Sequence, residues 1–188
     1  MHFEKLTNLP SLDVYDELDA MVEYGLLTWD YMNQICINVP QNNDSPYAGI
    51  GSLDLDWANV KETKDGLVAP PREVPLHEHD FTELCSIFKD TNIEQLYNSM
   101  TSIYKVGRVR LMRTEPRYAM SWHYDYNNRL HYPIKTQFGC FMVIEKQIEH
   151  LEKNCWYWTE TNQKYHTAFN GSNDCLLYTS DAADELCR

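Results

Sequence analysis

The segment SWHYDYNNRLH, Ser121–His131, places two histidines, an aspartate and an arginine within a few residues of one another. In an extended chain, side chains two positions apart share a face, so His123 and Asp125 can point at one ion. His166, in a later strand-like segment, can supply a third ligand. Two imidazoles and one carboxylate leave coordination positions open, which suits non-haem Fe(II), although Zn²⁺ accepts the same ligands. The spacing predicts a metal site.

Arg129 and His131 form a second pair, again two positions apart. They share a face if this segment is extended. A buried guanidinium requires an anion, and a dicarboxylate would offer two carboxylates. The pair therefore predicts an anion pocket beside the metal.

Two alternatives to this site remain open at the level of sequence. His123 and His166 can instead be core histidines that are hydrogen-bonded to backbone groups. His77 and His79, in LHEHD, form a rival H-x-H pair. Prolines and acidic residues surround that rival pair, which favours a solvated loop.

Composition limits the class of protein. The 188 residues are 43% hydrophobic and carry a net charge of −12, which predicts one domain with a real core. The negative charge argues against binding to nucleic acid or to an anionic membrane. The chain has no apolar run of membrane-spanning length and no signal core at its start, so we expect a cytoplasmic protein. The six cysteines contain no C-x-x-C pair, which favours reduced thiols over a zinc ribbon.

The first part of the chain has helical spacing of its apolar residues. We expect one helix from Ser11 to Gly25 and a second helical region over residues 80–100, interrupted near 90–92. Between them, ICINVP reads as a short strand. The segment from Lys61 to Pro75 reads as a long surface loop, because it is rich in proline.

From Tyr104 onward, the pattern changes to that of strands. In YKVGRVRLMR, the apolar Val109 and Leu111 alternate with arginines. HYPIKTQFGCFMVIE is rich in aromatic and β-branched residues, and CWYW and KYHTAF read as a hairpin around TETNQ. Helices followed by antiparallel strands predict an α+β fold that ends in a small barrel or jelly roll.

GRVRLMRTEPRYAMSWHYD, RLHYPI and KYHTAFNGS together resemble the aspartyl/asparaginyl β-hydroxylase family of Fe(II)/2-oxoglutarate oxygenases, over roughly Lys105–Asp174. The resemblance implies a double-stranded β-helix core, a cupin-like jelly roll, preceded by N-terminal helices. It also implies that His123 and His166 ligate iron. Asp125 stands where the acidic ligand belongs, a ligand that some members lack.

The same resemblance implies that Arg129 and His131 contact the 2-oxoglutarate carboxylate near the metal. The chain would then be a 2-oxoglutarate-dependent dioxygenase that hydroxylates an Asp, Asn or Pro-type peptidyl side chain or a small molecule. One alternative is a cupin-type metal enzyme without 2-oxoglutarate, and another is a noncatalytic jelly-roll binding module. The expected partner is a peptide or small-molecule substrate, with no nucleic acid and no membrane, and the oligomeric state stays open.

The end of the chain does not fit the rest. CLLYTSDAADE resembles a translated sequencing adapter, so we expect one oxygenase-like domain over 1–174 (helices and loops in 1–103, jelly-roll core in 104–174) and a non-native tail over 175–188. The family resemblance also implies an arginine about ten residues after the distal histidine, for the far carboxylate of 2-oxoglutarate. That position is Leu176. We therefore expect this anchor and the closing strand to be missing, and 2-oxoglutarate to bind weakly.

Overall fold

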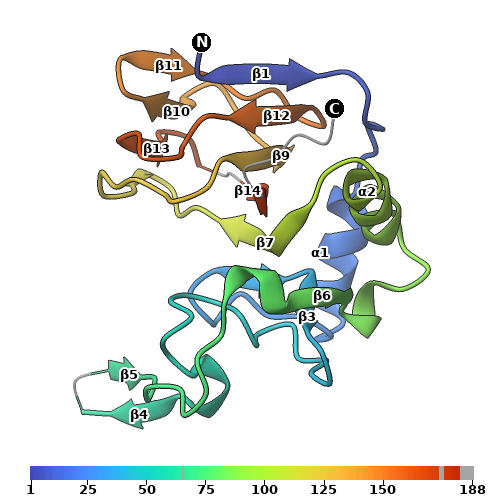
Figure 1. The fold of residues 1–188 in the computed structure, drawn as a ribbon, viewed down its shortest axis with the longest axis vertical. Coiled ribbons are helices and arrows are strands. Elements are labelled where there is room, and N and C mark those ends of the chain that lie inside the picture. Colours follow the sequence, from blue (N-terminus) through green and yellow to red (C-terminus); the bar gives the residue numbers. More distant parts are fainter. Residues whose placement is uncertain (65, 174–175, 183–188) are drawn as a thin grey trace.

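The computed structural model describes residues 1–64, 66–173 and 176–182, with the backbone alone for residues 58, 67 and 176–182. Strands make up most of the regular structure (Figure 1). The α-helices in this part of the chain are α1 (Tyr15–Glu23) and α2 (Asn92–Thr101). Among the described residues, none of the helices has the length and apolar character needed to cross a membrane.

The largest sheet has six antiparallel strands in the order β1-β12-β9-β14-β7-β2. Their bounds are Phe3–Leu6 (β1), Trp156–Thr159 (β12), Arg129–Lys135 (β9), Leu176–Ala182 (β14), Val106–Arg113 (β7) and Gln34–Cys36 (β2). Strands from the beginning, the middle and the end of the chain therefore lie side by side in one sheet.

A second sheet has four strands in the order β11-β10-β13-β8. Their bounds are Gln147–Glu149 (β11), Cys140–Ile144 (β10), His166–Asn170 (β13) and Tyr118–Ala119 (β8). Two small pairs complete the described strands: β3 (Asn38–Pro40) with β6 (Phe81–Leu84), and β4 (Lys61–Thr63) with β5 (Gly66–Val68). Short 3-10 helices occur at Trp57–Asn59 (η1), Glu78–Asp80 (η2) and Ser86–Phe88 (η3).

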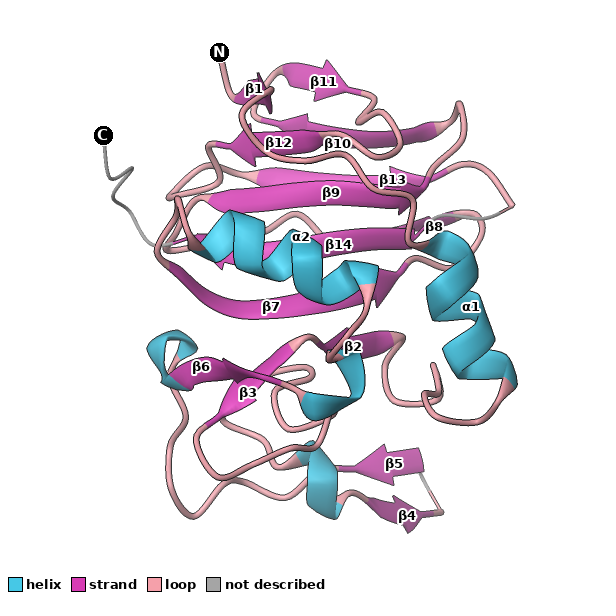
Figure 2. Cartoon of the chain, turned by 90° about the vertical axis from the view of Figure 1, so that its right-hand side faces the viewer, coloured by secondary structure: helices cyan, strands magenta, loops and turns pink. Residues whose placement is uncertain are grey.

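The two faces of the six-stranded sheet have different surroundings. Its outer face carries residues such as Leu111 and Tyr132, which are fully buried in the main core together with Leu18 of α1 and Leu96 of α2. Figure 2 shows α2 lying across this sheet. Alternation along the strands turns the intervening residues inward, toward the second sheet. The helices thus cover one face, and the other face is left to line a pocket.

In residues 1–64, 66–173 and 176–182, the architecture is mostly β-sheet with two α-helices. The strand order is compatible with the expected double-stranded β-helix. The helix expected from Ser11 to Gly25 is present as α1, and the alternating segment after Tyr104 forms β7.

Two expectations for the first part of the chain are wrong in detail. Residues 80–100 are not one interrupted helix, because β6 and η3 occupy the first half. The helix begins only at Asn92, where Thr91 accepts a hydrogen bond from the Glu94 amide as an N-cap. The segment from Lys61 to Pro75 contains the β4–β5 hairpin rather than loop alone.

Two expectations for the second part also differ from the structure. CWYW and KYHTAF do not form a hairpin: β12 pairs with β1 and β9, whereas β13 pairs with β10 and β8 in the other sheet. The closing strand is not missing, since β14 lies between β7 and β9. Of the tail predicted as non-native, residues 175 and 183–188 lie outside the described residues, and the prediction that the tail is foreign stays a prediction.

Candidate metal centre and anion pocket

The structure brings together the three side chains predicted as metal ligands. Among the described residues, the ligating atoms of His123, Asp125 and His166 all lie within 4.8 Å of one another. The backbone explains the convergence: the His123 amide donates to the His166 carbonyl at 3.1 Å, and the His166 amide donates back at 2.8 Å. This bridge joins the segment after β8 to the start of β13. Asp125, two residues on, turns to the same side.

Both histidines present the same nitrogen to the centre of this group. Nδ1 of His123 lies 2.8 Å from the carbonyl oxygen of Ser121, and Nδ1 of His166 lies 2.9 Å from that of Lys164. A carbonyl oxygen only accepts, so each Nδ1 carries the proton, and in the neutral ring Nε2 keeps its lone pair. Backbone carbonyls commonly fix metal-binding imidazoles in this way.

The spacing of the three side chains fits one ion. Metal bonds of about 2.0–2.2 Å set at right angles place neighbouring ligand atoms about 3 Å apart. Nε2 of His166 lies 3.3 Å from Oδ2 of Asp125. The ligand atoms of the whole group lie within 4.8 Å of one another, so binding a cation would draw them closer together.

Asp125 is held in its charged form. Burial by itself would raise the pKa of this carboxyl, but hydrogen bonds from His166 and Arg129, with the Arg129 charge, hold the pKa well below its usual range. Arg129 donates from Nε to Oδ2 of Asp125 at 2.8 Å, and the Asp125 side chain is 17% exposed. The sequence predicted Arg129 as a contact of the cosubstrate. In the structure, it donates a hydrogen bond to a predicted metal ligand, and its contact with a cosubstrate stays a prediction.

A pocket of about 280 Å³, partly open to the surface, adjoins the group. Strands of both sheets contribute to its wall. Its polar lining residues are Gln34, Arg110, Thr114, His123, Asp125, Arg129, His131, Thr136, His166 and Asn170. Most of its remaining lining is apolar and includes Met112, Met120, Phe141, Met142, Leu151 and Phe169. The cavity thus joins the group of three ligands to both residues predicted for the anion pocket.

His131 is nearly inaccessible, with 5% of its surface exposed. Burial, together with the charge of Arg129, lowers the pKa of His131 to about 3. The imidazole is therefore neutral near pH 7 and offers a hydrogen bond rather than a charge to a bound anion.

Arg110 on β7 is a cavity residue that the sequence analysis missed. It is 8% exposed, and its guanidinium donates to Oε1 of Gln34 at 2.9 Å. The same oxygen accepts from the Gly51 amide at 2.9 Å. Burial, aided by the charges of Arg108 and Arg129, lowers the pKa of Arg110 to about 9. One feature of the sequence could have identified Arg110 as a buried residue. It lies between two apolar strand residues, Val109 and Leu111, in a strand that is covered on both faces.

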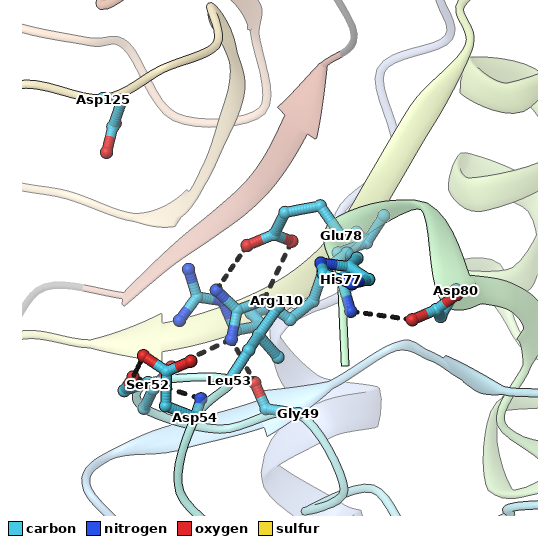
Figure 3. Close-up of polar contacts among 12 residues, drawn as sticks. Gly49, Ser52, Leu53, Asp54, His77, Glu78, Asp80, Arg110 and Asp125 are labelled. Atoms are coloured by element: carbon cyan, nitrogen blue, oxygen red, sulfur yellow. Dashed lines mark hydrogen bonds and ion pairs between the residues drawn. The ribbon is translucent and has the colours of Figure 1, made fainter. Parts of the chain in front are cut away.

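Arg108, two residues earlier on β7, is part of a separate polar cluster. Its guanidinium forms two contacts with the Glu78 carboxylate, Nε to Oε2 at 3.1 Å and NH2 to Oε1 at 2.8 Å. Figure 3 shows two dashed contacts at the Glu78 carboxylate. It also donates to the carbonyl oxygens of Gly49 and Gly51. A carboxylate and two carbonyls therefore satisfy Arg108 locally.

The rival pair, His77 and His79, lies next to this cluster. The two rings stack with their centroids 5.3 Å apart, and the His79 side chain is 76% exposed. In the described part of the chain, this pair does not belong to a group of three converging ligands. The structure supports the solvated-loop alternative for it.

The position expected for the anchor of the far carboxylate is occupied by Leu176. Its backbone is paired with Arg113 on β7 and with Lys135 on β9. Residues of β7 that line the cavity, such as Arg110 and Met112, alternate with Arg113. In this register, position 176 is therefore out of phase with the cavity-lining residues of β7.

Comparison with known proteins finds similarity in fold but not in sequence. Neither a family model nor a curated protein matches the chain. A 2OG-Fe(II) oxygenase family oxidoreductase from Burkholderia pseudomallei superposes with a TM-score of 0.50 at 11% identity, over 98% of this chain and 85% of that one.

Two further structures are more distant. A viral collagen prolyl hydroxylase from Paramecium bursaria chlorella virus-1 gives a TM-score of 0.48 at 15% identity, over 98% of this chain and 91% of that one. A cupin superfamily protein from Desulfitobacterium hafniense gives 0.35 at 12% identity, over 61% and 94%. At 11% identity, the first similarity shows a shared fold only. The TM-scores of the other two structures are below 0.5, so these similarities support no conclusion about this chain.

Proposed function

We propose that this protein is an Fe(II)- and 2-oxoglutarate-dependent oxygenase, with His123, Asp125 and His166 as its metal ligands. The observation that carries the proposal is the convergence of these three side chains, from segments far apart in the chain, on one pocket that Arg129 also lines. The paired sheets that enclose this cavity support a double-stranded β-helix core.

The chain's own residues would bind and orient the reactants. The two imidazoles donate Nδ1–H to backbone carbonyls, so that Nε2 of each ring can hold the metal. Asp125 supplies a permanent negative charge, held in place by Arg129. Arg129 and the neutral His131 would receive the carboxylate of 2-oxoglutarate next to the metal.

When bound, iron and 2-oxoglutarate supply, with O₂, the oxidising chemistry that hydroxylates a substrate C–H bond. The apolar part of the pocket wall would limit the access of water around them. For the substrate, the resemblance to the aspartyl/asparaginyl β-hydroxylases supports an Asp, Asn or Pro-type peptidyl side chain, with a small molecule as the alternative.

Oxygen uptake by the metal-depleted protein after readdition of Fe(II) tests this proposal. We expect uptake, and succinate formation, to require both Fe(II) and 2-oxoglutarate. Arg129→Ala should lower the rate by about 10- to 100-fold, since it orients a metal ligand and the cosubstrate. His79→Ala, on an exposed histidine, should leave the rate unchanged.

The competing functions predict different results. A metal enzyme that does not use 2-oxoglutarate would bind iron but show no response to 2-oxoglutarate. A noncatalytic binding module would not depend on iron at all. Either result would contradict the proposed oxygenase.

A further inference from the structure

Asp125, a predicted metal ligand, and Arg129, a predicted cosubstrate contact, stand at the two ends of one short turn. Asp125 precedes the turn, and Arg129 begins β9 directly after it. The hydrogen bond of 2.8 Å from Nε of Arg129 to Oδ2 of Asp125 joins the two side chains across the turn. The backbone conformation of residues 125–129 therefore decides where both side chains point.

Residues 159–163, which lead from the end of β12 toward β13, lie against this turn. We call them the clamp segment. Hydrogen bonds join the two segments along their length: Thr159 Oγ donates to the Arg129 carbonyl at 3.2 Å, Thr161 Oγ to the Asn127 carbonyl at 2.8 Å, the Asn162 amide to Oδ1 of Asn128 at 3.3 Å, and the Gln163 amide to the Asp125 carbonyl at 2.8 Å. The clamp segment thus holds the turn at several points of its backbone.

The clamp segment also leads to the third predicted ligand, because β13 begins at His166 shortly after the segment ends. It therefore connects the turn of Asp125 to the strand of His166, whose Nε2 lies 3.3 Å from Oδ2 of Asp125. A functional site of this kind needs its groups held within about 0.5 Å of the productive geometry. A shift of the clamp segment relative to the turn would change the separation of the two ligands.

Thr161 makes its contribution to the clamp segment through a side-chain group. It has 0% of its surface exposed, and its hydroxyl donates to the Asn127 carbonyl. Valine has a shape similar to that of threonine but no hydroxyl, so Thr161→Val would remove this donor from a buried place and leave the carbonyl without it. Asn162 and Gln163 donate from backbone amides, which a side-chain substitution does not remove.

We propose that Thr161 is a positioning residue of the metal centre, whose hydroxyl fixes the turn of Asp125 and Arg129 against the segment that leads to His166. The inference rests on the proposed function and deepens it, since it names a residue on which the geometry of that site depends. Thr161 touches neither the metal nor the cosubstrate. It acts through the backbone that carries Asp125.

Binding of Mn²⁺, in place of Fe(II), to the metal-free full chain tests the proposal. By isothermal titration, we expect folded Thr161→Val to bind Mn²⁺ about 10-fold more weakly than the wild type, which is the usual size of the loss when support for a ligand is removed. Thr161→Ser restores the hydroxyl and should bind Mn²⁺ within about 3-fold of the wild type. A role in stability alone would leave the Mn²⁺ affinity of the folded Thr161→Val protein unchanged.

Thr101→Val is the matched control, because the Thr101 hydroxyl also donates to a backbone carbonyl, that of Tyr97 at 3.0 Å, but within α2. Its Mn²⁺ affinity should equal that of the wild type. If Thr161→Val fails to fold, Thr159→Val removes the neighbouring hydroxyl of the clamp segment and should show a similar loss.

Wild-type affinity in the folded clamp variants, or a loss in Thr161→Ser as large as in Thr161→Val, would overturn the role of Thr161 while the metal centre stands. An equal loss in Thr101→Val would do the same. Wild-type protein that binds no Mn²⁺ would refute the metal centre and this inference together.

Discussion

Two polar clusters lie on the same strand, and they differ in how their charges are satisfied. Around Arg108, the Glu78 carboxylate and the carbonyls of Gly49 and Gly51 close the cluster, so that no ligand is needed. We call this the closed cluster. Arg110 donates to the neutral amide of Gln34 and lines the pocket, and burial with the charges of Arg108 and Arg129 lowers its pKa to about 9. Neighbouring arginines that look alike in sequence thus differ in their surroundings: Arg108 joins Glu78 to the loop of Gly49 and Gly51, and Arg110 lines the pocket.

Replacing each arginine with methionine should give the largest difference between the two clusters. Arg108→Met leaves Glu78 without its partner and two buried carbonyls without a donor, and should cost about 2–3 kcal/mol of unfolding free energy. Arg110→Met removes a charge that burial disfavours and should change stability by less than about 1 kcal/mol, in either direction. Urea unfolding of the metal-free variants measures both values. Equal losses at the two positions would contradict the distinction between the clusters.

The pH dependence of stability is a second way to compare the pocket with the closed cluster. The pocket lining includes His131, whose pKa is affected by Arg129, His166 and Asp125. The folded-state pKa of His131, about 3, is below the ordinary value of 6.5, so the unfolded chain binds more protons between those pH values. Stability from this group is present above pH 6.5 and is lost as the pH falls toward 3, by roughly 1.4 kcal/mol per unit.

His131→Gln should remove this dependence and keep a neutral hydrogen-bonding side chain. We expect the metal-free wild type to lose stability relative to the variant when the pH is lowered from 6.5 to 4.5. Parallel unfolding curves for the two proteins across that range would show that His131 is not held neutral by the cavity wall.

Much of the candidate site could be predicted because its residues are close in sequence and strand periodicity is simple. His123 and Asp125 needed only the rule that side chains two apart share a face, and His166 was proposed as the third ligand from its place in a separate strand-like segment, which the family resemblance also implies. Arg110 could not be assigned in this way. Alternation showed that it shares a face with Arg108, but only the tertiary structure reveals that Glu78 reaches one arginine and the cavity reaches the other.

The fold was predictable where a pattern is local, and it was mispredicted where pairing is distant. The helix α1 and the strand β7 follow from their own periodicity. The apparent hairpin of CWYW and KYHTAF fails because strands that follow one another in the chain join opposite sheets. Likewise, residues 80–90 were expected to be helical, but pairing of β6 with β3 makes Phe81–Leu84 a strand. Local sequence does not determine which distant strands pair with one another.

Titration of the metal-free protein with Fe(II) under anaerobic conditions tests the central claim most directly. We expect one ion per chain in the wild type and in His79→Ala, and a loss of affinity greater than about 100-fold in His166→Ala, which exceeds the usual effect of residues that only support a ligand. Circular dichroism should show that both variants remain folded. Folded His166→Ala that still takes up one ion with wild-type affinity would contradict the proposed metal centre.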